Sequence, residues 1–207
     1  MGLDMYLERM PRYKEATADD VSAVESYLNW AKAKEENSKY AQGTFEEWCG
    51  VKEVPCKEYI EFYSQYNTPK YYPWDTEKKS SYNMIIERIG YWRKANAIHK
   101  WFVENVQDGE DDCRYHNEVT KETLEELLNV CNTVFENCKL VPTANGFVVK
   151  DNSIAEKLLP TTSGFFFGGT DYDKWYVEDI KNTIKLINMV LETTDFENQM
   201  VYYYSSW

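Results

Sequence analysis

The segment that decides the fold is GYWRKANAIHKWFVENV, residues 90–106. It combines aromatic, basic and amide side chains and contains one of the two histidines of the chain, His99. At about 100° per residue, the spacing predicts a helix with one apolar face roughly 140° wide. His99 falls inside that face, Asn96 lies at its border, and Arg93 lies beyond the border on the solvent side.

Two interpretations of this predicted helix stay open. In the first, the histidine is an ordinary core residue bonded to a backbone carbonyl, because a buried imidazole needs hydrogen-bond partners. In the second, the helix is the wall of a ligand pocket with polar contacts, an aromatic surface for stacking and basic groups for an anion. These groups are, in that order, Asn96 and His99, Trp92 or Trp101, and Arg93 or Lys94. The basic pair falls in the first turn of the predicted helix, where free N–H groups and the positive dipole end also favour an anion.

The composition indicates an ordinary globular protein with an acidic surface. Its 207 residues, 43% of them hydrophobic, suffice for one domain with a sizeable core. The net charge of -12 argues against duplex nucleic acid and anionic membranes as partners, because both are polyanions. A small anionic ligand stays compatible, because a few local donors outweigh a distant field that salt screens within about 10 Å.

The five cysteines and the N-terminus predict a protein of a reducing cytoplasm. The cysteine count is odd and no CxxC pair occurs, so neither a disulfide nor a metal site is expected from them. Cys131 and Cys138 are expected to be small core residues on one helix face. The N-terminus has no basic region before a long apolar run, and no stretch reaches the roughly 20 apolar residues of a membrane span.

The periodicity of the whole chain predicts an α+β fold, a small mainly antiparallel sheet packed against three or four helices. The expected strands are 3–10, 82–88, 147–150, 165–167 and 200–204, the last in the same sheet as the first. The expected helices are 17–39, 90–106, 120–139 and a long last helix capped by Thr170 or Asp171. Residues 11–80 would form a helical and irregular insertion, or variable subregion, within a single domain spanning 1–207. Two prolines argue against regular structure in 68–75.

Two acidic features, residues 108–112 and Asp173, each have a functional and a structural interpretation. Residues 108–112 lack the ligand spacing of an EF-hand loop, so no metal is predicted there, and His116 is expected to be isolated and exposed. Asp173 would either complement the dipole of the last helix or face the central helix and orient His99 or Arg93. No GxxxxGK[ST] or GxGxxG motif occurs, so no cofactor is predicted.

Three motifs carry a resemblance to a known family. They are MGLDMYL at residues 1–7, GYWRKANAIHKWF at 90–102 with NVQ at 105–107, and LLP at 158–160 running into GFFFGGTDYD at 164–173. They resemble an uncharacterised family of small proteins encoded by tailed bacteriophages and prophages. The resemblance implies a phage origin and the cytoplasm of the host bacterial cell, but it assigns no catalytic residue. In genomic setting, small accessory phage proteins of unknown role often resemble those that blunt host immunity, and several of the latter sequester nucleotide second messengers.

Three functions are compatible with these features, and a homo-oligomer is compatible with each of them. The first is non-catalytic sequestration of a small anionic, nucleotide-type ligand by Trp92, Arg93, Lys94, Asn96, His99, Tyr172 and Asp173. The second is binding of a host protein through an acidic, tyrosine-rich surface that includes 59–74. The third is a hydrolase in which His99 acts as general base, oriented by Asp173. No serine elbow, Cys/His signature or metal cluster in the sequence supports the third function.

Overall fold

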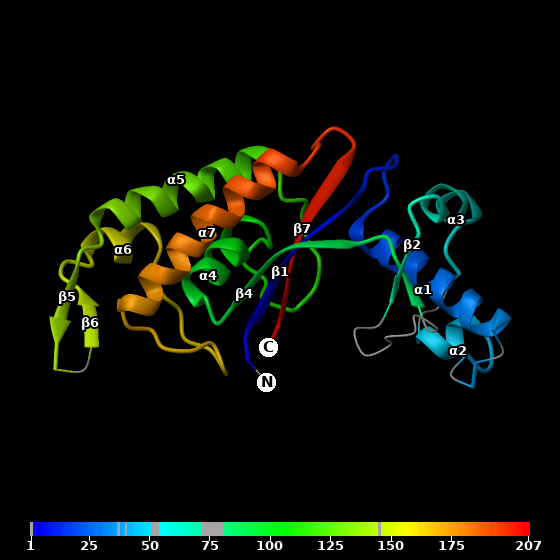
Figure 1. Cartoon of the computed structure of the whole chain (residues 1–207), viewed down its shortest axis with the longest axis horizontal. Helices are drawn as coiled ribbons and strands as arrows, with labels where there is room; N and C mark the ends of the chain where they lie inside the picture. Colours follow the sequence, from blue (N-terminus) through cyan, green and yellow to red (C-terminus); the bar gives the residue numbers. More distant parts are fainter. Residues whose placement is uncertain (1, 37, 40, 51–53, 72–80, 145) are drawn as a thin grey trace. The chain divides into compact units, whose positions relative to one another are not determined.

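The structure is a computed structural model that describes residues 2–36, 38, 39, 41–50, 54–71, 81–144 and 146–207. Within these residues it confirms the α+β prediction, with seven helices, a three-stranded antiparallel sheet and two separate pairs of strands (Figure 1). The chain divides into two compact units. Unit 1 comprises 1–8, 88–196 and 200–207, and unit 2 comprises 9–87 and 197–199. The predicted subregion 11–80 falls inside unit 2.

The three-stranded sheet has the order β4-β1-β7. Its strands are β1 (Asp4–Pro11), β4 (Glu87–Arg93) and β7 (Gln199–Ser206). The first and last strands of the chain therefore pair in one sheet, as predicted. Side chains on β1 alternate between the core and the other face, and Met5 and Leu7 are fully buried. This period of two is what a half-buried strand requires.

The predicted helix over 90–106 is only partly correct, because its first part belongs to a strand. β4 ends at Arg93, and the helix α4 covers Asn96–Asn105. Along β4 the burial alternates, with Trp92 buried and Tyr91 exposed. Apolar residues at these positions fit a helix face and a strand face equally well, and pairing with β1 decides for the strand.

Gly90 explains how closely the sheet packs against the long helix α7 (Lys174–Thr193). A Cβ at this position would lie 2.9 Å from the side chain of Leu186 on α7 and 3.2 Å from Leu7 on β1. A larger residue would require the side chain of Leu186 to move, since interiors are close-packed. Strand β4 and the helix that follows it are therefore held directly under α7.

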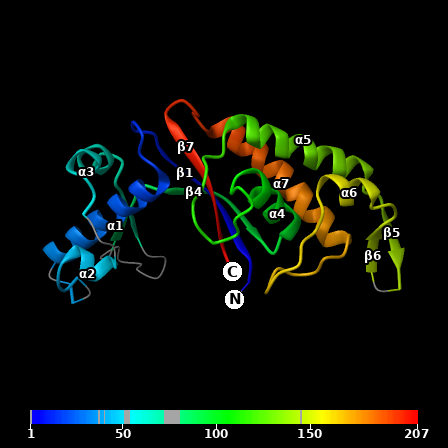
Figure 2. The same cartoon turned by 180° about the vertical axis from the view of Figure 1, so that it is seen from behind.

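Helices α5 (Lys121–Asn137) and α7 lie side by side, and α4 lies against α7 (Figures 1 and 2). Thr120 caps α5, because its hydroxyl accepts a hydrogen bond from the N–H of Thr123 at 3.2 Å. The sequence predicted Thr170 or Asp171 as the N-cap of α7, but the residue that caps this helix is Asp173. Unit 1 also contains β5 (Leu140–Thr143), β6 (Gly146–Val149) and the short helix α6 (Ser153–Leu158).

The predicted strand over 165–167 does not form. Phe165 and Phe166 are exposed, to 75% and 45%, and Phe167 alone is buried. Positive φ angles at Phe166 and Gly168, 69° and 93°, break the extended chain. Three consecutive apolar residues do not define a partner strand, and here they form a turn that buries one ring.

Unit 2 contains the helices α1 (Ala18–Glu35), α2 (Phe45–Cys49) and α3 (Lys57–Ser64), and the paired strands β2 (Thr68–Tyr71) and β3 (Ser81–Met84). The predicted helix 17–39 is present as α1, and Thr17 and Asp20 form a capping box at its start. The expectation of irregular structure over 68–75 is wrong for β2, because both strands of a two-stranded ribbon are edges and an edge tolerates Pro69. Residues 72–75 lie outside the described residues.

The prediction that Cys131 and Cys138 are core residues is confirmed, although only Cys131 lies within α5 and Cys138 is its C-cap residue. All five cysteines are free, and Cys131 and Cys138 are buried in the core of unit 1. None of the helices that the structure describes is both long enough and apolar enough to cross a membrane.

Candidate functional site

A cavity of about 370 Å³ lies in unit 1, at the junction between β4 and α4. Three segments line it: residues 93–98, the turn residues 161 and 168–171, and the start of α7 at 173–180. Its charged and aromatic lining residues are Arg93, Lys94, Asp171, Asp173, Trp175, Tyr176 and Asp179. The volume is within the range of roughly 300–1,000 Å³ that is typical of sites for small molecules.

One wall of the cavity is cationic. Nη1 of Arg93 lies 3.7 Å from a carboxylate oxygen of Asp4, which is a loose ion pair. The side chain of Lys94 has no ion-pair or hydrogen-bond partner among the described residues. Lys94 adopts a φ of 59° at the turn between strand and helix. If residue 168 had a side chain, its Cβ would lie only 3.3 Å from the Cβ of Lys94. Glycine at 168 therefore leaves room for this lysine beside the cavity.

The same wall contains the N-terminus of α4. The residue before the helix is Ala95, which has no side-chain acceptor, and no side chain caps the first turn in the part of the chain that the structure describes. Ala97 and Ile98, in that first turn, line the cavity. Their N–H groups have no acceptor within the helix, so the positive end of the helix dipole faces the cavity. Such an arrangement is one that favours an anion. The basic pair was predicted in the first turn of the helix, but it precedes the helix, which begins at Asn96.

The opposite wall is acidic and aromatic. Asp179 is partly buried, and no hydrogen bond to its carboxylate occurs among the described residues. Burial raises the pKa of Asp179 to about 7, and the negative charges of Asp173 and Glu178 contribute to the rise. The ring of Trp175 is 65% exposed at the cavity. This wall can therefore offer hydrogen-bond acceptors and a flat surface for stacking.

Asn96 positions the turn above the cavity. Its side-chain Nδ2 donates to the carbonyls of Phe167 at 3.3 Å and Gly169 at 2.8 Å, and its Oδ1 accepts from the N–H of Thr162 at 3.1 Å. The side chain is 5% exposed, so these three bonds satisfy a buried amide. Asn96, which was predicted as a polar contact to a ligand, thus lines the cavity and uses its amide to hold the turn that shapes it.

His99 does not line this cavity. Its Nδ1 accepts a hydrogen bond from the hydroxyl of Tyr203 at 2.7 Å, and its Nε2 donates to Asp111 at 3.0 Å. Burial lowers the pKa of His99, against the opposing effect of Asp111, so the neutral tautomer with Nε2–H fits both bonds. The 1% exposure of His99 agrees with the core interpretation, but its partners are two side chains and not a backbone carbonyl, and it borders a second hollow that Asp111 and Trp207 also line. The partner that orients it is Asp111, whereas the carboxylate of Asp173 accepts the N–H groups of the first turn of α7.

Four of the seven residues predicted for the site line the cavity, namely Arg93, Lys94, Asn96 and Asp173. Trp92 does not, because it is buried and its indole N–H donates to the hydroxyl of Thr183 at 2.9 Å. Tyr172 borders a separate, more open hollow beside β6. Trp101, the other tryptophan considered for stacking, is in the core.

Sequence reasoning missed Trp175 and Asp179. They lie four residues apart on α7 and therefore share one face of that helix, beside its buried stripe. A tryptophan and an acid at this spacing, just after a helix N-terminus, is the signal that points to them.

Comparisons of the chain with protein-family models, with curated proteins and with solved structures find no match. The chemistry of the cavity is therefore judged from its own residues. One wall can bind an anion through two cationic side chains and a helix N-terminus. The other can stack a planar ring and accept hydrogen bonds.

Proposed function

We propose that this protein binds and sequesters a small anionic, nucleotide-type ligand in the cavity, without catalysis. The observation that carries the proposal is the cationic wall, where Arg93, Lys94 and the uncapped N-terminus of α4 open into one cavity of about 370 Å³. An anionic group such as phosphate would accept hydrogen bonds from the first-turn N–H groups and pair with the two cations.

The acidic and aromatic wall suits the rest of a nucleotide. A base stacked on Trp175 would gain about 1–3 kcal/mol, as bases do on aromatic side chains elsewhere. Asp171 and Asp179 can accept hydrogen bonds from an amino group of the base or from a ribose hydroxyl. A simple anion such as sulfate would leave this wall without a partner, so the mixed chemistry favours a ligand with both an anionic and a hydrogen-donating end.

Binding without turnover is supported by the groups at the cavity. Among the lining residues that the structure describes, there is no serine, cysteine or histidine. The hydroxyl of Tyr176 donates to the carbonyl of Leu159 at 2.8 Å, and burial raises its pKa well above the usual range, so it is no nucleophile. Both ring nitrogens of His99 are occupied by Tyr203 and Asp111. The hydrolase hypothesis therefore ranks below sequestration.

The biological setting of the proposal comes from the phage-like motifs. In the cytoplasm of an infected bacterium, such a protein would counter host defence by removing a nucleotide signal from solution. Binding of a host protein through 59–74 stays an alternative prediction. Part of that segment packs within unit 2, since Tyr63 is fully buried and Phe62 stacks on Tyr13 at 3.9 Å between ring centroids, whereas 72–74 lie outside the described residues.

The first experiment is mass spectrometry of small molecules released by heat from protein purified from phage-infected, defence-active cells. We expect an intact nucleotide at near-stoichiometric yield. A chemically altered nucleotide would support the hydrolase instead. Absence of any ligand, together with no heat of binding for AMP, 3′,5′-cyclic AMP and a cyclic dinucleotide in calorimetry, would contradict the proposal.

Variants then test the cationic wall. Lys94→Gln and Arg93→Gln should each weaken binding of the identified nucleotide by about 10- to 100-fold, because a hydrogen bond to a charged group contributes about 1.5–3 kcal/mol. The matched control is Lys121→Gln on α5, which also removes one positive charge and only a weak surface ion pair with Glu125. Equal effects in all three variants would indicate a general charge effect and not a site.

A further inference from the structure

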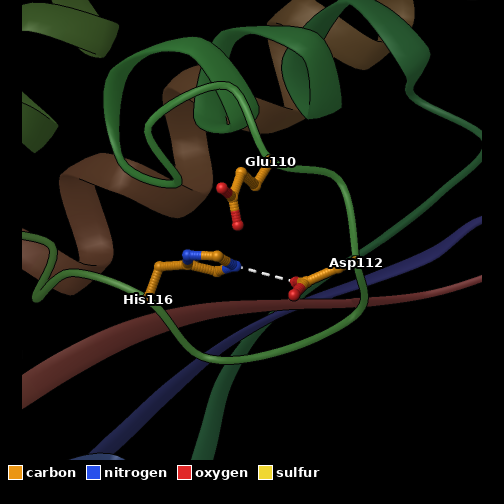
Figure 3. Close-up of side chains that lie close together, drawn as sticks. All are labelled: Glu110, Asp112 and His116. Carbon is orange, nitrogen blue, oxygen red and sulfur yellow. Dashed lines mark hydrogen bonds and ion pairs between the residues drawn. The ribbon is translucent and has the colours of Figure 1, made fainter.

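Three metal-ligating side chains converge on the loop that follows α4. They are Glu110, Asp112 and His116, and one donor atom from each lies within 4.8 Å of the other two. Nε2 of His116 lies 2.7 Å from a carboxylate oxygen of Asp112. Figure 3 shows the carboxylate of Glu110 pointing toward the same imidazole from the other side of the loop. We propose that these three side chains bind a divalent transition-metal ion, with Zn²⁺ as the best-fitting ion.

The loop is built to keep this arrangement. The side chain of Gln107 is fully buried, and its Nε2 donates to the carbonyl of Arg114 at 3.1 Å across the loop. At the far end, Asn117 donates to the carbonyl of Val106 at 2.9 Å. Both ends of the loop are therefore fixed by side-chain amides, and the N–H of Glu110 is fixed as well, by the carbonyl of Gln107 at 2.9 Å. Ligands on a fixed loop lose little conformational entropy when an ion binds.

The charges at the cluster favour a cation. Glu110 and Asp112 are both acidic and close together, and the side chain of Glu110 has no partner among the residues that the structure describes. One oxygen of Asp112 faces His116, and the other lies 3.3 Å from Nε of Arg114. A divalent ion would neutralise both carboxylates and could use the oxygen that faces the imidazole, leaving the arginine pair in place.

The ligand types select the ion. Two carboxylates alone would suit Ca²⁺ or Mg²⁺, but an imidazole shifts the preference to transition metals such as Zn²⁺. Ligands about 2.0–2.1 Å from a tetrahedral Zn²⁺ lie roughly 3.4 Å apart, so the present separations need only small rotations of the side-chain ends. Three protein ligands leave the remaining position to water.

The sequence concealed this cluster because its members are not regularly spaced. The acids do not match an EF-hand, and His116 was expected to be isolated and exposed. Cys113 adopts a φ of 59°, and this turn brings His116 back onto Asp112, where its side chain is only 16% exposed. The site therefore depends on a backbone turn that the residue pattern does not reveal.

The test uses the two histidines of the full-length protein. Imidazole ¹⁵N resonances are followed by NMR during titration with ZnCl₂ at about pH 7. We expect one equivalent of Zn²⁺ to shift the ring resonances of His116 and to leave those of His99, which is committed to Tyr203 and Asp111, unchanged. If the ring resonances of His116 do not move at a several-fold excess of Zn²⁺, the proposal is wrong.

Calorimetry with ZnCl₂ on variants identifies the ligands. His116→Ala and Glu110→Gln should each lower the affinity at least tenfold, because losing even an outer-shell partner of a metal ligand costs about 10- to 100-fold. Glu104→Gln on α4 is the control, because it removes one nearby negative charge outside the cluster and should change the affinity less than threefold. A loss of the same size in the control would show that Zn²⁺ is only attracted to the acidic surface.

Two further variants separate this site from its competitors. Cys113→Ser tests the nearby thiol, and an affinity that collapses in this variant but survives in Glu110→Gln would overturn the assignment. Arg114→Gln removes the cation that competes for Asp112, so it should tighten Zn²⁺ binding by a few-fold. Weaker binding in this variant would contradict coordination through Asp112.

Discussion

Replacing Asp179 by asparagine should stabilise the protein at about pH 8 and have almost no effect at about pH 4. The carboxyl group of Asp179 is partly buried in the wall of the cavity, next to Asp173 and Glu178. Burial and these two charges both disfavour its ionised form. Asparagine has nearly the same shape and no charge, so the variant resembles the protonated state at every pH.

The sign of the effect follows from the two pKa values of Asp179. The value is 3.8 for the unfolded chain and about 7 in the folded protein. Below about pH 4 the acid is protonated in both states and costs nothing. Between about pH 4 and 7 the unfolded chain is ionised while the folded protein still holds its proton, so the stability falls over this range and levels off above about pH 7. A pKa shift of this size corresponds to roughly 4 kcal/mol. Because water reaches part of the group, we expect about half of that, roughly 2 kcal/mol, at about pH 8.

The assay is urea unfolding of wild type and Asp179→Asn at about pH 8, 6 and 4, followed by circular dichroism. The gain in the free energy of unfolding should shrink steadily as the pH falls. Glu125→Gln, an exposed acid on α5, is the control and should stay within about 0.5 kcal/mol of wild type at every pH. A gain that is independent of pH would refute the reasoning. A loss at about pH 8 would mean that the ionised carboxylate has a cationic partner such as Lys94.

Three other predictions concern buried side chains. Tyr203→Phe removes the hydroxyl that donates to Nδ1 of His99 and should lower the free energy of unfolding by about 1–3 kcal/mol, measured in urea, because a buried acceptor is left without a partner. Asn96→Ala removes three hydrogen bonds to the turn above the cavity and should cost about 2 kcal/mol or more, with faster amide exchange in residues 162–169. Burial raises the pKa of Cys131 to about 12, so iodoacetamide at about pH 8 should alkylate exposed Cys56 and spare Cys131 in native protein, as read by mass spectrometry.

The parts of the fold that depend on neighbours in the chain could be predicted from the sequence. The starts of the helices predicted from 17 and from 120 lie within one residue of the observed starts, because the caps at Thr17 and Thr120 need only residues three positions apart. The first and last strands were also predicted to lie in one sheet, and β1 and β7 are neighbours in it. The boundary inside 90–106 could not be predicted, because Trp92 satisfies a helical and a strand period equally, and only the sheet partner separates them.

The residues of the candidate site also divide into predictable and unpredictable ones, according to how far apart in sequence the contacting residues lie. Arg93 and Lys94 lie next to a helix N-terminus in sequence, so their position beside that end of the helix was predictable even though the helix begins later. The partner of His99 was not, because Asp111 reaches it through a loop that leaves the helix and returns. A periodic pattern tells which face of a helix is buried but not which loop covers that face. Acid–histidine pairs that form across loops, such as His116 with Asp112, therefore cannot be predicted from the residue pattern. The path of the backbone has to be known before a chemical role can be proposed for such a pair.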